Sequence, residues 1–206
     1  MEITAAMVKE LRSQSGAGIM EGKSALKETK GDVEDAITFL RKKGLAKADK
    51  KADRQTTEGK IGSYIHQGSK IGVLLALHCE TDFVANTPDF QELAKDIAMH
   101  IAASKPRFAT REEVTEKILE KEREIYSHQA KESGKPENII EKIVSGKMEK
   151  FYEENCVLEQ AFVKDTSITI GNLIKQKIAL LGENINLGKF ARFEFLWTNR
   201  VIKGFC

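Results

Sequence analysis

An eight-residue segment near the amino terminus matches the pattern of a phosphate-binding loop. Ala17 to Ser24 reads AGIMEGKS, in which Ala replaces the first glycine and Gly-Lys-Ser ends the motif. In such loops a buried strand leads into the turn and fixes the backbone amides that surround the phosphates. Here the preceding residues, VKELRSQSG, are amphipathic and typical of a helix. The segment is therefore predicted to be helical, and a P-loop ATPase or GTPase that uses Lys23 and Ser24 is the enzymatic alternative.

A second group of polar side chains has the residue types of a metal site. His78, Glu80 and Asp82 alternate along the end of a predicted strand, so they share one face of it. Only one of the three is His, and no matching pair lies elsewhere in the sequence. Catalytic signatures such as G-x-S-x-G or H-E-x-x-H do not occur. We therefore expect no metal, no cofactor and no catalytic centre, and the chain is predicted not to be an enzyme.

One aromatic residue lies in a position where an aromatic is unusual. Phe83 belongs to the segment TDFVAN, which connects a predicted strand to a predicted helix, and such connections are exposed by default. An exposed aromatic side chain is a candidate for insertion into a pocket of a partner. The alternative is that Phe83 folds inward beneath the helix, as large apolar side chains commonly do. The sequence leaves both arrangements open.

The composition is typical of a globular, soluble protein. Of 206 residues, 41% are hydrophobic and 31% are charged, which argues against disorder, collagen and a disulfide scaffold. Lys and Arg number 33 against 31 Asp and Glu, so the formal net charge of +2 does not by itself indicate a nucleic-acid or anionic-membrane partner. No apolar stretch approaches the ~20 residues that a membrane span needs. We expect neither a membrane nor a direct nucleic-acid partner.

The cysteines and the first residues bear on the compartment. Cys79, Cys156 and Cys206 are widely spaced and form no C-x-x-C pair, which indicates reduced thiols rather than a disulfide or metal framework. The first twelve residues mix acidic and basic side chains, unlike a secretory signal or a transit peptide. We expect a cytoplasmic protein, or one of an organellar stroma or matrix.

The elements that position these residues divide into two predicted units, of which the first is residues 1–45. Three short amphipathic helices are predicted in it. The first follows a possible cap at Thr4, the second ends at Gly31, and the third begins after the cap Asp32 and stops at Gly44. About forty residues form only a marginal core, so we expect this module to keep apolar surface for a partner or for the rest of the chain.

A basic segment follows the helices. Arg41 to Arg54 carries seven basic residues against Asp49 and Asp53. This segment is predicted to be a solvated linker or an extension of the helix, and residues 46–58 are assigned as a basic linker between the two units. A nucleic-acid-binding module that uses this arm is the alternative, but no aromatic residue is interleaved that would stack on bases.

Residues 59–206 are predicted to form an α+β domain. Residues 61–66 and 70–79 are β-rich and joined by a short glycine-containing loop, which is typical of an antiparallel hairpin. Residues 184–197 alternate aromatic and charged side chains and predict a third strand, with a possible bulge at Gly188. Helices are expected to cover one face of this three-stranded antiparallel sheet.

Four helices are predicted between the hairpin and the last strand. The first has the Thr-Pro-Asp start that favours a helix after Thr87. The other three starts are a capping box of Thr110 and Glu113, Pro136, and a cap at Ser167.

Several segments occur in the order that is found in one protein family. They are ITAAMVKELRSQSGAGIMEGKSALKETKGD, YIHQGSKIG, the signature TDFVAN, IAMHIAASKPRF, SGKPENIIEKIVSGKMEKF and GENINLGKFARFE. Together they resemble elongation factor Ts, the guanine-nucleotide exchange factor of elongation factor Tu, over nearly the whole chain. The chain resembles the short form, with one core repeat where longer relatives have two. The ending FLWTNRVIKGFC does not resemble the family.

This resemblance implies a function without a catalytic site. In the family the amino-terminal module is ubiquitin-associated-like (UBA-like), and AGIMEGKS is part of its helices rather than a nucleotide site. The resemblance further implies that the chain loosens the Mg²⁺ and phosphate site of elongation factor Tu so that GDP leaves, and that two copies of the chain can pair as a homodimer. By correspondence, the residues that contact elongation factor Tu are Arg12, Ile19, Met20 and Lys23 on the module, and Thr81, Asp82, Phe83 and Val84 on the second domain, with Leu181, Gly182 and His66 nearby.

Overall fold

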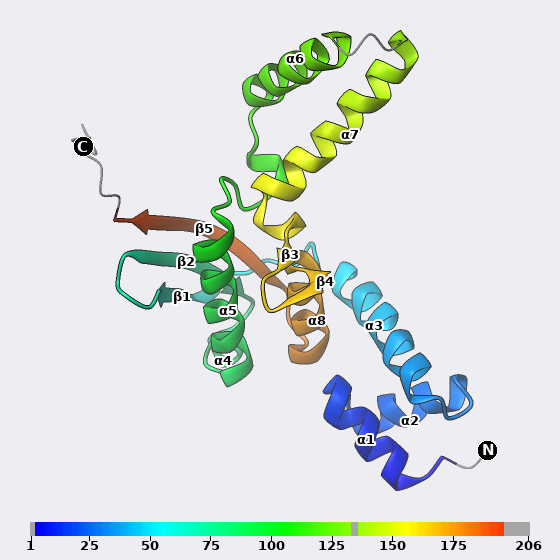
Figure 1. Cartoon of the computed structure of the whole chain (residues 1–206). Coiled ribbons are helices and arrows are strands. Elements are labelled where there is room, and N and C mark those ends of the chain that lie inside the picture. Colours follow the sequence, from blue (N-terminus) through cyan, green and yellow to red (C-terminus); the bar gives the residue numbers. More distant parts are fainter. Residues whose placement is uncertain (1–2, 133–135, 196–206) are drawn as a thin grey trace.

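The computed structural model describes residues 3–132 and 136–195 (Figure 1). Helices and one three-stranded antiparallel sheet are combined in it, which confirms the α+β prediction. An amino-terminal helical module and a long helical hairpin project from opposite ends of the part that contains the sheet, which we call the main domain (Figure 1). Nothing in the described residues tests the predicted boundaries at 45 and 58, and the division into domains stays a prediction.

The amino-terminal module consists of three helices around a small core. They are α1 (Ala5–Ser15), α2 (Ile19–Glu28) and α3 (Val33–Asp49). The predicted caps are confirmed, because Thr4 accepts a hydrogen bond from the backbone N–H of Met7 and Asp32 accepts one from that of Asp35. The side chains buried together are Val8, Leu11, Ala25, Leu26 and Ala36.

The prediction that Gly44 ends the third helix is wrong. Helix α3 passes through Gly44 and continues to Asp49. A glycine inside a helix costs about 1 kcal/mol relative to alanine, and the good helix formers that follow it tolerate that cost. Burial of Ala48 against the main domain further stabilises the extension. Of the two alternatives for Arg41–Arg54, the helical extension is found as far as Asp49.

The sheet has the strand order β1-β2-β5 with both pairs antiparallel. Its strands are β1 (Glu58–Ile65), β2 (Ile71–Cys79) and β5 (Ile185–Glu194). This confirms the predicted hairpin and the third strand, although Trp197 lies outside the described residues. The register between β2 and β5 shifts so that Gly188 and Lys189 face Ala76, which confirms the bulge at Gly188.

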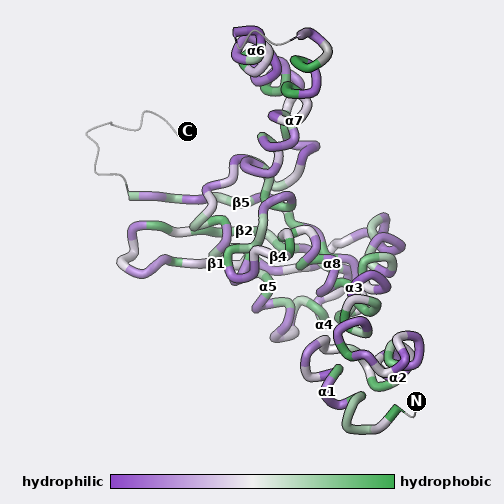
Figure 2. The backbone as a smooth tube through the Cα atoms, turned by 45° about the vertical axis from the view of Figure 1, so that its right-hand side comes forward, coloured by the Kyte–Doolittle hydropathy of each residue, from purple (hydrophilic) through white to green (hydrophobic). Residues whose placement is uncertain are grey.

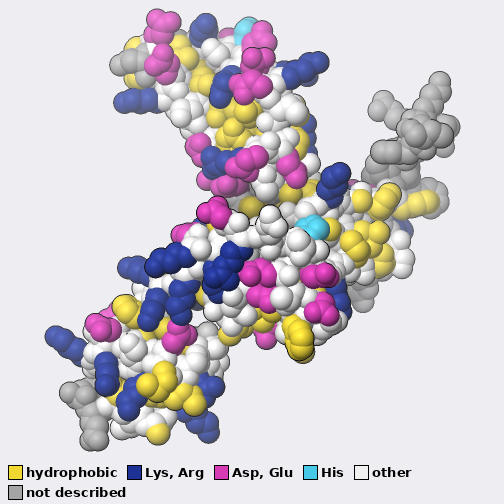
Figure 3. All heavy atoms as spheres, turned by 180° about the vertical axis from the view of Figure 1, so that it is seen from behind, with side chains coloured by type: hydrophobic (Ala, Val, Ile, Leu, Met, Phe, Trp, Pro, Cys, Tyr) yellow, Lys and Arg dark blue, Asp and Glu magenta, His cyan; other side chains and the backbone are white. Residues whose placement is uncertain are grey.

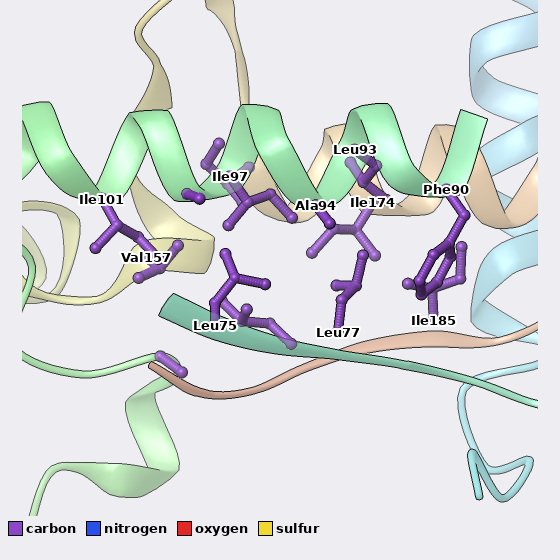
Figure 4. Close-up of a cluster of buried hydrophobic side chains, with 14 of the residues drawn as sticks. Leu75, Leu77, Phe90, Leu93, Ala94, Ile97, Ile101, Val157, Ile174 and Ile185 are labelled. Atoms are coloured by element: carbon purple, nitrogen blue, oxygen red, sulfur yellow. The ribbon is translucent and has the colours of Figure 1, made fainter. Parts of the chain in front are cut away.

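Helices cover one face of the sheet. Helix α5 (Pro88–Ser104) begins with the predicted cap, since Thr87 accepts a hydrogen bond from the N–H of Phe90. Helix α8 (Ile170–Leu181) packs beside α5 and ends at Gly182 in the left-handed conformation. Figure 4 shows side chains of α5 pointing toward those of β2, with Ile174 of α8 and Ile185 of β5 completing the layer.

The long hairpin is formed by α6 (Glu116–Glu132) and α7 (Glu137–Asn155). The predicted capping box of Thr110 and Glu113 is wrong. Residues Arg111–Glu113 form a short 3-10 helix, η1, and the Glu113 carboxylate accepts a hydrogen bond from the N–H of Ala109 at 2.7 Å instead. The helix therefore starts only after this turn.

The predicted cap at Ser167 is also wrong. Ser167 lies in strand β4 (Asp165–Thr169), which pairs with β3 (Ala161–Phe162), and its hydroxyl donates to Asp165 at 2.6 Å. The cap of α8 is Thr169, which accepts from the N–H of Asn172 at 3.2 Å. The sequence offers two hydroxyl residues two positions apart, and the strand pairing selects the second.

Arg111 links the base of the hairpin to the main domain. The Arg111 guanidinium donates to Glu159 at 2.7 Å and to Glu149 at 2.8 Å, and it lies over the ring of Tyr152. Glu159 belongs to η2 (Val157–Glu159), which packs against α8. These two ion pairs raise the pKa of Arg111 further above its ordinary value.

No helix in residues 3–132 or 136–195 has both the length and the apolar character that crossing a membrane requires.

Candidate functional site

The segment AGIMEGKS does not have the surroundings of a phosphate-binding loop. It begins in the turn after helix α1 and continues into α2, so a helix and not a buried strand leads into it. The Arg12 side chain closes the turn by donating to the Ala17 carbonyl at 3.1 Å. Lys23 and Ser24 lie exposed on the surface of α2. This geometry agrees with the helical prediction for the segment.

The residues considered for a metal site lie along the end of β2 and the turn that follows. His78 lies against the bulge of β5, where a Cβ at Gly188 would approach its Nε2 to 2.5 Å. The Glu80 carboxylate accepts a hydrogen bond from the N–H of Asn184 at 2.6 Å and forms an ion pair with Arg54. In the part of the chain that the structure describes, no group of three or more His, Cys, Asp or Glu side chains is placed to hold a metal ion.

Two neighbouring apolar side chains are exposed at the start of α2. Ile19 is 59% exposed and Met20 is 77% exposed, although both are large hydrophobic residues. The opposite face of α2 is turned inward, because Gly22 lies so close to α1 that its Cβ would be 3.6 Å from a methyl group of Leu11. Lys23 follows Met20 by one helical turn on the outer face. Arg12 is exposed on the adjacent helix α1, so the structure brings together the four residues predicted on the module.

The signature TDFVAN forms a single helical turn, α4 (Asp82–Ala85). Val84 and Ala85 are buried in the core of the main domain, whereas Phe83 is 85% exposed. Of the two arrangements that the sequence leaves open, the structure has the exposed one. The reason is that the two residues after Phe83 occupy the inward face of the turn and leave Phe83 on the outside.

Helix α4 is held in place by the turn between α8 and β5. The Glu183 carboxylate accepts hydrogen bonds from the N–H of Thr81 at 3.0 Å and from its hydroxyl at 2.6 Å. The Thr81 hydroxyl oxygen in turn accepts from the N–H of Val84 as the cap of α4. Asn86 closes the other end by donating to the Asp82 carbonyl at 2.8 Å. Phe83 is thus exposed on a turn with fixed backbone.

The buried thiol beneath this turn is part of the same support. Cys79 is fully buried and donates to the Thr81 carbonyl at 3.1 Å. Burial raises the pKa of the Cys79 thiol above its usual value, and the nearby Glu183 carboxylate acts in the same direction. The thiol therefore remains protonated and has a structural place in the site.

Sequence reasoning assigned no role to Glu183 or Asn184. Asn184 is 1% exposed, and its side-chain amide donates to the carbonyls of Ala52 and Arg54 at 3.0 and 2.8 Å. Both residues lie in the segment GENI, whose match to the family was the only signal available. Leu181 and Gly182 directly precede them and are thereby close to Thr81.

The structure does not bring His66 to this cluster. His66 lies at the turn of the β1–β2 hairpin, where its ring pairs with the hydroxyl of Tyr64 at 3.1 Å. Thr81 follows the opposite end of β2, and the nine residues of that strand span about 27 Å at ~3.4 Å per residue. The expectation that His66 lies near Phe83 is therefore wrong. A separate contact of His66 with a partner stays a prediction.

The two elements that carry the exposed apolar side chains, α2 and α4, lie on the same side of the main domain. In both Figure 1 and Figure 2 the module and α4 lie on the side away from the α6–α7 hairpin. Figure 3 shows basic side chains gathered where α3 meets the main domain, between the surfaces of these two parts. Lys47 of α3 forms an ion pair with Glu21 of α2, and this contact lowers the pKa of Glu21.

Comparison with known proteins identifies a family that has this arrangement of segments. A family model described as "Elongation factor TS" matches residues 4–196. Elongation factor Ts of Fervidobacterium nodosum is 60% identical over 194 residues, which cover 94% of this chain and 98% of that protein. Elongation factor Ts of Solibacter usitatus is 55% identical over 193 residues, covering 94% and 91%. That of Geobacter sulfurreducens is 57% identical over 193 residues, covering 94% and 89%.

Proposed function

This chain belongs to the elongation factor Ts family of translation factors, and from that premise we propose that it is a guanine-nucleotide exchange factor that binds elongation factor Tu and promotes release of GDP. It acts without a catalytic residue of its own, and its place of action is the cytoplasm or an organellar stroma or matrix. The observation that carries the proposal is the 85% exposed Phe83 on a turn whose backbone is fixed by hydrogen bonds.

An exchange factor works by binding the nucleotide-free GTPase more tightly than the GDP-bound form. Thermodynamic linkage then requires that the factor weakens GDP binding by the same ratio by which GDP weakens binding of the factor. Couplings between two sites typically amount to about 1–3 kcal/mol, so two separate contacts reach a larger total than one. The surfaces at α2 and α4 supply two such contacts.

Phe83 is assigned to the disruptive contact. Its ring enters the GTPase and displaces backbone that positions Mg²⁺ and the phosphates, which removes the main neutralisation of the diphosphate charge. Thr81 and Asp82 directly precede Phe83, and the hydrogen bond from Thr81 to Glu183 fixes the backbone that orients the ring. Val84 is buried behind the ring and supports it from within the main domain.

The module is assigned to an anchoring contact. Met20 is unbranched and adaptable and, with Ile19, offers apolar surface to a neighbouring helix or groove. Lys23 and Arg12 add charged groups around this apolar pair, and their contribution depends on salt concentration.

Release of a fluorescent GDP analogue from elongation factor Tu tests the proposal. The Phe83→Ala variant is expected to lose at least about tenfold of the accelerated release rate, because a central aromatic contact contributes about 2 kcal/mol or more. The matched control is Ile125→Ala, which removes an exposed apolar side chain from the distant helix α6 and should leave the rate unchanged. An unchanged rate in Phe83→Ala would show that the ring is not the disruptive element.

Calorimetry separates this function from the P-loop alternative. The purified chain is titrated with Mg-GTP and with Mg-ATP, and the exchange-factor proposal predicts no heat of binding for either nucleotide. Tight binding that is lost in Lys23→Ala would instead favour a nucleotide site on the chain itself.

We further propose that two copies of the chain pair through the face of the sheet that the helices leave open. Ile61, Ile65, Leu74 and Phe193 are exposed on this face, and Ile65 reaches across Gly72 toward β5. An apolar patch of this kind can match its own copy about a two-fold axis. Sedimentation velocity over a range of concentrations should show a dimer that Phe193→Ser dissociates, whereas a monomer at all concentrations would contradict the pairing.

A further inference from the structure

Helix α3 is shared between the module and the main domain. Ala36 in its first turn is fully buried in the small core of the module, and Ala48 in its last turn is 2% exposed within the core of the main domain. The helix has 17 residues and is therefore about 25 Å long at ~1.5 Å per residue. A continuous helix is stiff over this length, so its two ends cannot turn independently of each other.

The middle of α3 lies unusually close to α8. A Cβ built on Gly44 would lie 3.3 Å from the Cβ of Ala179, which is closer than methyl groups normally pack. The absence of a side chain at Gly44 lets the two helix backbones approach, and this explains why a residue unfavourable in helices lies inside α3. Any larger side chain here would push α3 away from α8.

Polar contacts continue this seam beyond the end of α3. Lys175 of α8 pairs with Asp49 at 2.7 Å, and the Lys51 ammonium donates to the carbonyl of Gly182. The Asn184 side chain then binds the carbonyls of Ala52 and Arg54. The segment after α3 is thus attached to the same turn, between α8 and β5, that supports α4 through Glu183.

The α1–α2 turn approaches α8 less closely, since a Cβ built on Gly16 would lie 3.7 Å from a methyl group of Leu180. A cavity of about 220 Å³ lies between this turn, α3 and α8, and Gln14, Glu21, Leu40 and Gln176 are among its lining residues. The position of the module relative to the main domain therefore depends on the seam between α3 and α8.

We propose that this seam holds the two contact surfaces, at α2 and at α4, as one preset rigid pair, and that Gly44 is the positioning residue that fixes their relative orientation. The inference rests on the proposed function, because it concerns how both surfaces meet elongation factor Tu at once. Binding at one surface then raises the effective concentration of the other, and that gain is lost when the geometry does not match.

A distance measurement tests the rigid pair in the free protein, independently of exchange. Spin labels are placed on Lys27→Cys in α2 and Glu92→Cys in α5, with Cys206→Ser as background and the buried Cys79 and Cys156 unlabelled. A single narrow distance distribution is expected. A broad distribution would overturn the inference and would leave the proposed exchange function untouched.

Kinetics of GDP release test the role of Gly44. Gly44→Leu is expected to raise the factor concentration for half-maximal exchange by about tenfold or more while the maximal rate is kept, because the lost gain is one of avidity. Partial unfolding would also raise the apparent half-maximal concentration, so the folded fraction of each variant is measured by circular dichroism and the rates are plotted against the concentration of folded protein.

A double variant that moves one methyl group from α8 to α3 tests whether the effect of a side chain at Gly44 can be reversed. Gly44→Ala alone should raise the half-maximal concentration by a smaller factor, and Gly44→Ala combined with Ala179→Gly should restore it, since the double variant moves the methyl group from one helix to the other. Unchanged kinetics in both Gly44→Leu and Gly44→Ala would overturn the inference. If the wild-type chain accelerates no GDP release at all, the proposed function fails, and the distance measurement alone then decides whether the pair is rigid.

Discussion

The start of α2 and the turn α4 both expose large apolar side chains, but they are supported in different ways. Met20 projects from a module with five residues in its buried cluster, whereas Phe83 projects from a turn whose neighbours belong to the much larger core beneath the sheet. Polar bonds from Glu183 further fix the backbone of α4. The first turn of α2 has a glycine cap without a side-chain hydrogen bond.

Met20 and Phe83 are similarly exposed, but from this difference in support we infer different roles for the two proposed contacts. A side chain that must displace part of a partner has to be held firmly, because otherwise it would yield before the partner does. A side chain that only anchors can adapt, and the flexible thioether of Met20 suits that role. The small core also makes the module easier to unfold than the sheet and the helices that cover it.

The largest expected effect is on the core of the module. Leu26 is fully buried there, and Leu26→Ala should cost about 2–5 kcal/mol, as Leu-to-Ala changes in cores do. Because so few residues share this core, we expect the module to unfold while the sheet remains folded. Hydrogen exchange should show lost protection in α1, α2 and the first turns of α3, together with weaker binding of elongation factor Tu.

A matched change in the main domain provides the contrast. Leu77 is equally buried, but Leu77→Ala should lower protection throughout the sheet and α5 together. If Leu26→Ala also lowered protection across the sheet, the two parts would unfold as one unit, and the proposed difference in support would be wrong.

The next effect concerns the support of Phe83. Glu183→Ala removes both acceptors of Thr81, and since Thr81 is exposed and can bind water instead, the loss of stability should be only about 1 kcal/mol. The accelerated rate of GDP release should nevertheless fall several-fold, because the turn that carries Phe83 is loosened. Glu124→Ala on the exposed surface of α6 is the control. Loss of stability without loss of exchange would show that the fixed backbone is not needed.

A smaller effect depends on pH and is confined to the main domain. His100 is fully buried, and its ring forms a hydrogen bond with Gln160 at 2.9 Å. Burial lowers the pKa of His100 below its ordinary value of 6.5, and the bond to Gln160 acts in the opposite direction. The unfolded chain therefore binds the proton first as the pH falls.

The stability that His100 contributes is consequently complete above pH 6.5 and is lost as the pH falls below that value. The free energy of unfolding should decrease there with a slope of at most about 1.4 kcal/mol per pH unit. Urea denaturation between pH 5 and 8, followed in the main domain by hydrogen exchange of α5 amides, measures this slope. His100→Gln should flatten it, and an unchanged slope would assign the pH dependence to other groups.

The sequence predicted most elements because their signals are local. The caps at Thr4, Asp32 and Thr87 are short hydrogen-bond motifs, and the alternation along β2 marks its buried face. Gly44 was misread as a stop because the reason for a glycine there is Ala179, 135 residues along the chain, whose approach no local pattern reveals. Tertiary contact decides such positions.

The candidate site could be proposed from the sequence, but much of its geometry could not be predicted. The exposure of Phe83 and Met20 agrees with a role in binding, but the family correspondence placed His66 near Phe83, which the antiparallel register of the hairpin excludes. The bonds from Glu183 to Thr81 join residues 102 positions apart and had no signal other than family resemblance. The contacts of these residues with elongation factor Tu stay a prediction.

The smallest expected effect distinguishes the charged from the apolar part of the module surface. Lys23→Ala should weaken binding by less than about 1 kcal/mol, because exposed ion pairs contribute little, and the loss should shrink as salt is raised from 0.05 to 0.5 M, where screening is strong. Met20→Ala should weaken binding by an amount that salt does not reduce, since its contribution is apolar burial. Arg12 is less suitable for this test because its side chain also closes the α1–α2 turn through Ala17. If the losses of binding in the Met20 and Lys23 variants shrank equally as salt was raised, the module would bind chiefly through its charge. Its contact would then differ from that of Phe83 in chemistry as well as in stiffness.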